Sequence, residues 1–325
     1  MSNSEWGLSI IIEWDNVRLS EMRRCREMLR TVGRQAAELC DRAGGTGLLG
    51  RLRCPIHLLV TYNEEEIDVG SVRQVVEEEM APYVAHLAVQ YLSEAQGSYY
   101  SLKNLAAANA TGDILLFIDS DVIPEHGWLV ALVSSFEDPA VQIVGGHAYI
   151  DAHSLYERAV ALTWFFPRRV ENGALEKYHR FFANNFAVRA GTFRRFPFPE
   201  PKDGARTAGI ALRETLRRNG IDLYRNSMAQ VRHPAPNGLH HFLQRAIAHG
   251  RDDAVVGRTT GVRQRWLRHL LRSYRAVLLE RNRVGLSVIE IPAALVIGTV
   301  YWVLAAISAG ATRVAPSFMA RHFRL

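Results

Sequence analysis

The feature that most constrains this chain is an unbroken apolar run that ends in two closely spaced acids. Residues 114–118 read Ile-Leu-Leu-Phe-Ile, and Asp119 and Asp121 follow. Such a run predicts a strand buried on both faces, as in parallel sheets that helices cover. Because burying two unpaired charges is costly, we expect both carboxylates at the carboxyl end of this strand, where open α/β sheets bind ligands.

The spacing of the two acids predicts a metal site. Alternate residues of an extended segment point to the same side, so Asp119 and Asp121 can face one ligand while Ser120 points away. Carboxylate oxygens suit Mg²⁺ or Mn²⁺, and substrate phosphates commonly complete the coordination of these ions. The pattern therefore indicates a ligand that carries a diphosphate. The alternative is a polar turn after a strand, because Asp and Ser are common turn residues.

Strand and helix patterns alternate through the first half of the chain. Predicted strands lie at residues 8–14, 56–60, 86–89, 114–118 and 141–144, and predicted helices at residues 22–39, 69–80 and 127–136. Strands separated by helices favour right-handed crossovers and a parallel sheet. This is the architecture of an α/β nucleotide-binding domain.

Composition agrees with a folded chain that has a sizeable core. The chain has 325 residues, 48% of them hydrophobic, which is enough for one large α/β domain or two smaller ones. The three cysteines, Cys25, Cys40 and Cys54, are odd in number and lack metal-site spacing. We therefore expect reduced thiols in a cytoplasmic setting.

The stretch from Lys103 to Leu129 resembles glycosyltransferase family 2, the inverting nucleotide-sugar transferases with a GT-A fold. Its features follow in order as a helix with Lys103-Asn104 and small residues, Gly-Asp, the apolar strand, Asp-Ser-Asp, a proline and Trp-Leu. The resemblance implies an α/β fold in which helices sandwich a GT-A-like nucleotide-binding sheet. It also implies a nucleotide-diphospho-sugar donor, and a hydroxyl acceptor such as a lipid-linked or cell-envelope glycan in polysaccharide biosynthesis.

The resemblance also implies roles for the residues of the donor half. Lys103 would be a fixed cation that meets the diphosphate, with Asn104 beside it. Asp121 would hold Mn²⁺ or Mg²⁺, and Asp119 would face the ribose or the same metal. The alternative for any single lysine is a solvated surface charge.

Two strand ends depart from the family pattern. The first strand ends in Glu13-Trp14-Asp15-Asn16, in which Asn16 matches the family and Glu13 replaces a proline. Glu13, Trp14 and Asp15 are candidate nucleotide contacts, although Trp14 could equally pack in the core and Asp15 cap a turn. The second strand ends at Glu64 where relatives usually carry a pair of acids, so Glu64 is the candidate for binding the base.

The second half of the chain is expected to bind the acceptor. The segment Phe181 to Arg189 resembles the family's asparagine-bearing strand near the acceptor sugar. Asn184 or Asn185 could therefore hydrogen-bond a sugar hydroxyl.

Inverting transfer needs a carboxylate that removes the proton of the acceptor hydroxyl. The acid pair that supplies this base in the family is missing, because residues 208–209 read Ala-Gly. The nearest acids are Glu200 and Asp203, and we choose Asp203 because it lies between Pro201 and Gly204 in a predicted loop. The alternative is that Asp203 is a solvent-exposed loop acid.

His233 is the third predicted metal ligand, with Asp119 and Asp121. It follows a short predicted strand at residues 228–232, where family members often place a histidine. A neutral imidazole can complete a metal shell. The alternative is a structural histidine.

The tail changes the expected location of the protein. No residue from Ile291 to Thr312 is charged, and this length matches a membrane-spanning helix. The preceding segment is basic, with Arg263, Arg265, Arg268, Arg272, Arg275, Arg281 and Arg283. We predict a catalytic domain at residues 1–235, a basic helical segment at 236–285 and a hydrophobic membrane segment with a basic tail at 286–325.

The basic segment suits an anionic membrane, and the positive-inside rule places the catalytic domain on the cytoplasmic face. The tail would then anchor the chain by a transmembrane helix. The alternative is an interfacial or buried helical hairpin that does not cross, because Arg313, Arg321 and Arg324 keep the far end basic as well.

Other functions are less consistent with the pattern. A net charge of +6 could suit nucleic acid, but no aromatic and basic groove pattern accompanies it, so no nucleic-acid partner is expected. A sugar nucleotidyltransferase should carry a Gly-rich basic loop after the first strand, and residues 14–19 do not. A degenerate GT-A scaffold that binds nucleotide or membrane without catalysis stays open, because the acid pair is missing.

Overall fold

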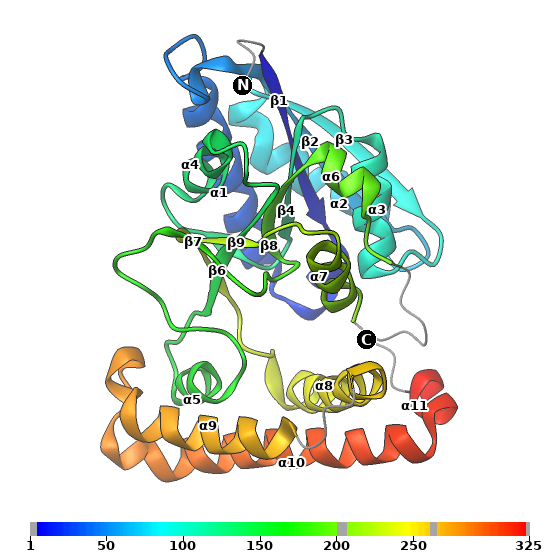
Figure 1. Cartoon of the computed structure of the whole chain (residues 1–325), viewed down its shortest axis with the longest axis vertical. Helices are drawn as coiled ribbons and strands as arrows, with labels where there is room; N and C mark the ends of the chain where they lie inside the picture. Colours follow the sequence, from blue (N-terminus) through cyan, green and yellow to red (C-terminus); the bar gives the residue numbers. More distant parts are fainter. Residues whose placement is uncertain (1–4, 200–206, 261–264, 323–325) are drawn as a thin grey trace. The chain divides into compact units, whose positions relative to one another are not determined.

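The computed structural model describes residues 5–199, 207–260 and 265–322, which form two compact units (Figure 1). The first, here the sheet unit, comprises Met1–Ala148, Val170–Glu200 and Gly209–Arg232. The second, here the helical unit, comprises Tyr149–Arg169, Pro201–Ala208 and His233–Leu325. Residues 149–169 thus group with the C-terminal helices, which differs from the boundary that the sequence suggested at residue 235.

A nine-stranded sheet organises the first unit, with strand order β3-β2-β1-β4-β8-β6-β9-β5 and with β7 paired to β9. The strands are β1 Trp6–Glu13, β2 Leu52–Asn63, β3 Leu87–Glu94, β4 Ile114–Asp119, β5 Ile123–Pro124, β6 Ile143–Ile150, β7 Leu175–Lys177, β8 Asn185–Arg189 and β9 Tyr224–His233.

The strand directions correct one expectation. Strands β3, β2, β1 and β4 are parallel, as the alternating pattern predicts. Strand β8, however, lies antiparallel to β4, and β6 lies antiparallel to β8. The predicted fifth strand, β6, therefore runs in the same direction as β4 but is not its neighbour. A fully parallel sheet was the wrong prediction, because a strand from much later in the chain is inserted beside β4.

Helices on the two faces of the sheet follow from the strand order. The helices of this unit are α1 Met22–Cys40, α2 Val69–Met80, α3 Tyr99–Asn109, α4 Trp128–Ser134, α6 Ala190–Arg195 and α7 Ala208–Arg218. Helix α1 packs with α2 and α4, whereas α3 packs with α6 (Figure 1).

The order of the strands reverses at β1. The chain builds outward from β1 through β2 to β3 and then returns to place β4 on the other side of β1. Such a reversal opens a ligand crevice at the carboxyl ends of β1 and β4.

An aromatic cluster forms the core beneath this edge. Phe117 of β4 is fully buried, and its ring stacks on Phe186 of β8 with 4.5 Å between centroids. The rings of Phe193 and Phe198 also pack around Phe117, with centroids 4.9 and 6.3 Å from the Phe117 centroid. Because adjacent strands contribute stacked rings, the cluster holds β4 and β8 together just below the two acids.

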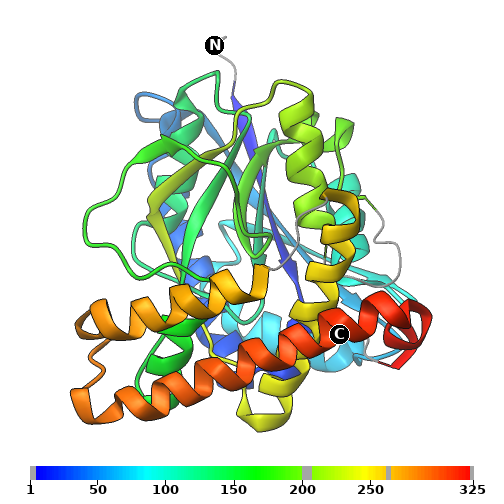
Figure 2. The ribbon, with the colours of Figure 1, turned by 60° about the horizontal axis from the view of Figure 1, so that its bottom comes forward.

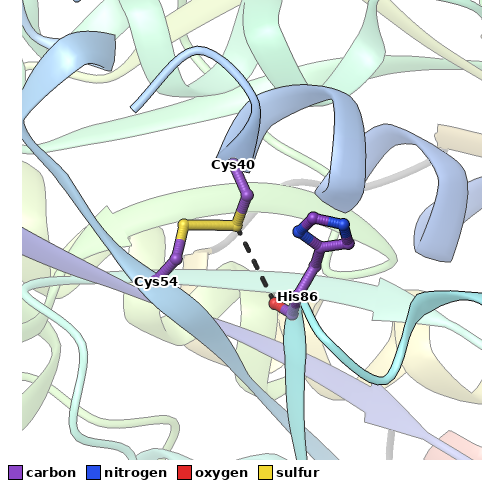
Figure 3. The surroundings of a disulfide bond; sticks show 3 residues. All are labelled: Cys40, Cys54 and His86. Carbon is purple, nitrogen blue, oxygen red and sulfur yellow. Dashed lines mark hydrogen bonds between the residues drawn. A yellow bond between two sulfur atoms is a disulfide. The ribbon is translucent and has the colours of Figure 1, made fainter. Parts of the chain in front are cut away.

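The cysteines also differ from expectation. Cys40, at the end of α1, and Cys54, near the start of β2, form a disulfide with their Cα atoms 6.1 Å apart (Figure 3). The Cys40 Sγ lies 3.8 Å from the carbonyl oxygen of His86. The prediction of three reduced thiols was wrong for this pair, because the loop between α1 and β2 brings the two side chains together. Cys25 is a buried thiol, and burial raises its pKa to about 12.

The helical unit contains α5 Leu155–Thr163, α8 Gly238–Thr260, α9 Arg265–Leu279, α10 Ile291–Val314 and α11 Pro316–His322. Helix α10 packs against α5, α8 and α9. Figure 2 shows α9 running beside α10 while α8 crosses it. The segment Val288–Val314 is long and apolar enough to cross a membrane: its most apolar 18-residue window has a mean hydropathy of 2.0, although 33% of that window is buried inside the protein.

The aromatic cluster generates a stability prediction. Phe117→Ala should lower the free energy of unfolding by about 3–5 kcal/mol, because it removes a fully buried ring and leaves a cavity. Val84→Ala is the control, since Val84 is 68% exposed and its loss should change stability by no more than about 0.5 kcal/mol. Urea denaturation measures both. Equal effects of the two substitutions would show that Phe117 is not part of the core.

Candidate functional site

The candidate site lies at the carboxyl ends of β1 and β4, where two carboxylates are neighbours. Glu13 of β1 pairs in register with Asp119 of β4, and the Ser120 backbone N–H donates to the Glu13 carbonyl oxygen at 3.2 Å. The exposed fractions of the two acids are 0% and 4%. The sequence placed Asp119 at this edge correctly, but the structure buries it much more deeply than a solvent-facing metal ligand.

Asp119 is held by three different side chains. The Lys103 ammonium donates to Asp119 Oδ1 at 2.6 Å, and the Tyr99 hydroxyl lies 2.9 Å from both carboxylate oxygens. The amide nitrogen of Asn16 donates to Oδ2 at 3.0 Å and lies 3.2 Å from Glu13 Oε2. Because both oxygens of Asp119 already accept hydrogen bonds, this carboxylate is fixed in orientation.

Helix α3 delivers two of these donors because of its register. Tyr99 and Lys103 are four residues apart, so they lie on the same face of the helix. Ser98 caps the helix: its hydroxyl accepts from the Ser101 backbone N–H at 3.2 Å, and its own N–H donates to the Ser101 hydroxyl at 2.7 Å. The Lys103 ammonium also lies 4.4 Å from the centre of the Tyr99 ring. The cap therefore sets the position of both donors.

Burial dominates the electrostatics of the two acids. Desolvation raises the pKa of Glu13 well above its usual value, and the neighbouring Asp119 carboxylate raises it further. Burial also raises the pKa of Asp119, while the Lys103 ammonium acts in the opposite direction. Strongly shifted carboxyls at a sheet edge are typical of functional sites.

Asp121 lies in the turn that follows β4 and is 8% exposed. The Arg24 guanidinium donates to its carbonyl oxygen at 2.7 Å and to the carbonyl oxygen of Arg232 at 2.5 Å, which ties the turn to α1 and to β9. This contact fixes the backbone of Asp121. The Asp121 carboxylate is close enough to Asp119 to contribute to raising the pKa of Asp119.

The donor set decides what kind of metal site would fit. Among residues 5–199, 207–260 and 265–322, no group of three or more His, Cys, Asp or Glu side chains is placed to hold a metal ion. Mg²⁺ and Mn²⁺ commonly use one or two carboxylates and complete their shell with phosphates and water. The residues therefore fit an ion that Asp121 would hold together with a diphosphate, because Asp119 is already occupied by Lys103, Tyr99 and Asn16.

His233 ends β9 and belongs to the helical unit. Its ring packs on Phe166 at 4.6 Å and on Trp164 at 6.0 Å between centroids. Its Nδ1 lies 2.7 Å from the Pro234 carbonyl oxygen. Because a carbonyl oxygen only accepts, Nδ1 carries the hydrogen, and Nε2 is the acceptor nitrogen of the neutral ring. In this tautomer a metal would be bound through Nε2.

The two candidate acceptor residues differ in their surroundings. The Asn185 amide is fully engaged, since it accepts from Trp128 Nε1 at 2.8 Å and donates to the Ala229 carbonyl oxygen at 3.1 Å. Asn184 is 7% exposed, and its Oδ1 has no hydrogen-bond partner within the described part of the chain. Its carbonyl oxygen accepts from the Asp119 N–H at 3.4 Å. Asn184 therefore lies beside the site with a buried acceptor atom still available.

The strand-end candidates separate into buried and surface residues. Trp14 is 2% exposed, and its backbone N–H donates to the Thr61 carbonyl oxygen at 2.9 Å. Asp15 forms an ion pair with Arg18. The Glu64 carboxylate accepts from the Ser93 hydroxyl at 2.6 Å.

Asn104 lies next to Lys103 in sequence but serves another purpose. Its amide donates to the Phe198 carbonyl oxygen at 2.8 Å and accepts from the Phe198 N–H at 3.1 Å. It therefore anchors the chain just before Glu200 and Asp203. Those two acids, the candidates for the catalytic base, lie outside the described residues.

Sequence reasoning missed three residues that build this edge. Tyr99 could have been found from its four-residue spacing to Lys103. Asn16 was noted as a family match without a role, and the structure shows that it bridges Glu13 and Asp119. The sequence contained no indication of the role of Arg24, because this residue bonds backbone oxygens that are far away in sequence.

A comparison with family models bears on this geometry. Residues 69–197 match the model described as Glycosyl transferase family 2. The chain contains a glycosyl transferase family 2 domain. The matched stretch runs from α2 to the end of α6 and includes Lys103, Asp119, Asp121 and Asn184. It leaves out β1, where the sequence departs from the family pattern.

Two solved structures are similar to this chain. A mannosyltransferase from Pyrobaculum calidifontis, PcManGT, in complex with GDP-Man and Mn²⁺, is similar with a TM-score of 0.50 and 14% identity over 98% of this chain and 81% of that one. Residues 1–349 of S. aureus TarS in complex with UDP-GlcNAc match with a TM-score of 0.49 and 12% identity over 95% and 92% of the two chains. No curated protein matches the sequence. The predicted α/β, GT-A-like fold is confirmed.

The buried ion pair of the family 2 domain can be tested directly. Lys103→Met should lower the free energy of unfolding by about 3–5 kcal/mol, because it leaves the Asp119 carboxylate buried without its cation. Adding Asp119→Asn should recover a part of this loss, with a coupling of about 1–3 kcal/mol in a double-mutant cycle. Urea denaturation of the four proteins measures the coupling.

Lys177→Met is the matched control for this cycle, because Lys177 and Asp222 form an ion pair with side chains that are 67% and 57% exposed. Its loss should change the free energy of unfolding little, because water and salt screen an exposed ion pair. Additive effects of Lys103→Met and Asp119→Asn would contradict the assigned contact.

Proposed function

We propose that this chain transfers a sugar from a nucleotide-diphospho-sugar to a hydroxyl acceptor, with inversion at the anomeric carbon and with Mn²⁺ or Mg²⁺. One observation carries the proposal. Asp119 is fixed at the switch point between β1 and β4 by Lys103, Tyr99 and Asn16, with Asp121 directly after it. A rigid carboxylate edge at such a switch point is suited to a nucleotide diphosphate.

The donor would bind along the carboxyl ends of β1 and β4. Glu13 and Asp119 would face the ribose and base. Trp14 and Asp15 directly follow β1, and Glu64 directly follows the neighbouring strand β2. Lys103 is fully buried and donates to Asp119, so it acts on the donor through Asp119 and not as an exposed phosphate-binding cation. The complex of PcManGT with GDP-Man and Mn²⁺ supports a nucleotide-sugar and a divalent ion here as well.

The proposed metal would be held by Asp121 and by the donor phosphates, with His233 as a further candidate ligand. A bound divalent cation would neutralise the charge that develops on the departing diphosphate. The Arg24 contact keeps the Asp121 backbone in place while this charge changes.

In the chemical step, the acceptor oxygen forms a bond to the anomeric carbon as the bond from that carbon to the diphosphate oxygen breaks. The nucleoside diphosphate leaves with the electron pair of the broken bond, and the hydroxyl proton passes to a carboxylate base. Asp203 is the proposed base, with Glu200 as the second candidate. Asn184 is proposed to orient the acceptor, because its Oδ1 is buried without a hydrogen-bond partner in the described residues.

The proposed site of action is the cytoplasmic face of the cell membrane. The long apolar helix α10 supports a membrane location, and the basic residues before it support contact with anionic lipid. The acceptor would then be a lipid-linked or cell-envelope glycan.

The second candidate function is a degenerate GT-A scaffold that binds nucleotide without turnover. The missing acid pair at residues 208–209 favours this alternative. It shares the donor site with the enzyme and differs only in the chemical step, so one experiment can separate the two.

Donor binding and turnover should respond to different substitutions. Wild type should be stabilised by UDP or GDP with Mn²⁺, by about 2.7 kcal/mol at a ligand concentration of 100 times Kd. Asp121→Ala should remove the part of this stabilisation that depends on Mn²⁺. Asp203→Asn should keep binding but lower donor turnover, by transfer or hydrolysis, by about 10²–10⁴-fold. Thermal shift and release of nucleoside diphosphate are the two measurements.

The matched control is Asp113→Ala, at the opposite end of β4 from Asp121, where binding and turnover should not change. Binding without turnover of any UDP- or GDP-sugar would favour the scaffold. Full turnover by both Asp203→Asn and Glu200→Gln would exclude these acids as the base. Absence of nucleotide binding by wild type would reject both functions.

A further inference from the structure

Helix α10 is packed along one side over most of its length. The Trp302 indole donates to the Thr163 carbonyl oxygen at 3.0 Å and to the Ser273 hydroxyl at 2.9 Å. The Tyr301 hydroxyl accepts from the indole of Trp164 at 2.7 Å. Farther along, the Ser308 hydroxyl donates to the Ile247 carbonyl oxygen at 2.6 Å. This side of α10 is therefore already occupied by α5, α8 and α9.

The opposite side of α10 is an exposed apolar row. Val296, Val300, Val303 and Ile307 follow at spacings of four, three and four residues, which places them on one face of the helix. Their exposed fractions are 61%, 41%, 41% and 63%. No residue of α10 before Arg313 carries a charge.

Helix α9 lies antiparallel beside α10 and extends this row. The Tyr274 hydroxyl bonds the Thr299 hydroxyl at 2.7 Å, and the His269 ring stacks on Trp302 at 4.6 Å. Three leucines lie on the same face of α9 as Tyr274, because residues 267, 271, 274 and 278 are four, three and four residues apart. The leucines are Leu267, Leu271 and Leu278, with exposed fractions of 42%, 58% and 55%. We call these leucines and the four residues of the α10 row the docking face.

A row of arginines borders the docking face. Arg268, Arg272 and Arg275 are exposed and lie one residue beyond the leucine row on α9, on the side away from α10. Within the described residues none of the three has an ion-pair partner, and α9 contains no acid. The nearest acids in sequence, Glu280 and Glu290, pair instead with Arg168 and Arg158.

We propose that the docking face lies flat on an anionic lipid bilayer, with α9 and α10 in the plane of the interface. An apolar face bordered by arginines is the pattern of an interfacial helix, and the basic row complements lipid phosphates. The contact of Ser273 with Trp302 puts Arg272 level with the middle of α10. If α10 crossed the membrane with α9 beside it, these arginines would enter the hydrocarbon, which is costly.

This inference does not depend on the proposed transfer reaction, because its test measures lipid binding and not turnover. The full chain is mixed with vesicles of phosphatidylcholine alone or with added phosphatidylglycerol, and bound protein is sedimented. We expect binding to the anionic vesicles that weakens with salt. Arg268→Gln/Arg272→Gln/Arg275→Gln should weaken it on the order of 100-fold, and Leu267→Ser/Leu271→Ser should weaken it at least about tenfold.

Matched controls use residues of the same kind elsewhere. Leu239→Ser removes an apolar side chain that is 72% exposed on α8, and Arg217→Gln/Arg218→Gln removes two exposed arginines of α7. Both should bind vesicles like wild type. Equal binding to the two kinds of vesicle, or unchanged binding by the docking-face variants, would overturn the proposal. So would leucine variants that change only the oligomeric state in light scattering, because the face would then bind a second copy of the chain.

A labelling experiment separates lying in the membrane plane from crossing it. In a Cys25→Ala background, Phe318→Cys places a thiol in α11, after α10, and Val84→Cys places one in the sheet unit. Sealed membrane vesicles from expressing cells are treated with a membrane-impermeant maleimide. Labelling of both thiols from the same side is the expected result. Labelling from opposite sides would show that α10 crosses and would overturn the in-plane arrangement.

Discussion

The buried contact between Lys103 and Asp119 is the interaction on which the candidate site depends. Both side chains are almost completely removed from water, and the ammonium lies 2.6 Å from the carboxylate. A buried charge is tolerated only when its partner stays in place, so this contact ties α3 to the end of β4. Tyr99 and Asn16 complete the set of donors, and Glu13 is held in the same group. The edge is therefore rigid before any ligand binds.

The sequence predicted the elements of this edge better than it predicted their contacts. The strand at residues 114–118, its two acids and the helix with Lys103 are all observed, because apolar periodicity and the cost of buried charge are local signals. The role of Lys103 was not predictable in the same way. A lysine near a predicted diphosphate suggests a direct contact with the phosphate. Only the tertiary structure shows that the Lys103 ammonium is already paired with the Asp119 carboxylate. Asn104 is similar, since it bonds the distant backbone of Phe198.

The larger differences between expectation and structure also come from contacts that are distant in sequence. Strand β8 inserts beside β4, which turns a predicted parallel sheet into a mixed one. Cys40 and Cys54 meet because α1 and β2 return to the same end of the sheet unit. The apolar tail was predicted correctly as a helix, but its sequence could not show that one side of α10 is covered by α5, α8 and α9. From the sequence alone, α10 was therefore indistinguishable from a membrane-spanning helix.

The central claim is that Lys103 fixes Asp119 while Asp121 takes the metal and the donor phosphates. The most direct test is the anomalous diffraction of Mn²⁺ in crystals grown with the nucleoside diphosphate that binds best. We predict an Mn²⁺ peak bound to the Asp121 carboxylate and to the diphosphate, with the Lys103 ammonium still bonded to Asp119. A bound nucleotide without Mn²⁺ at Asp121, or an ion on Asp119 with Lys103 displaced, would contradict the account.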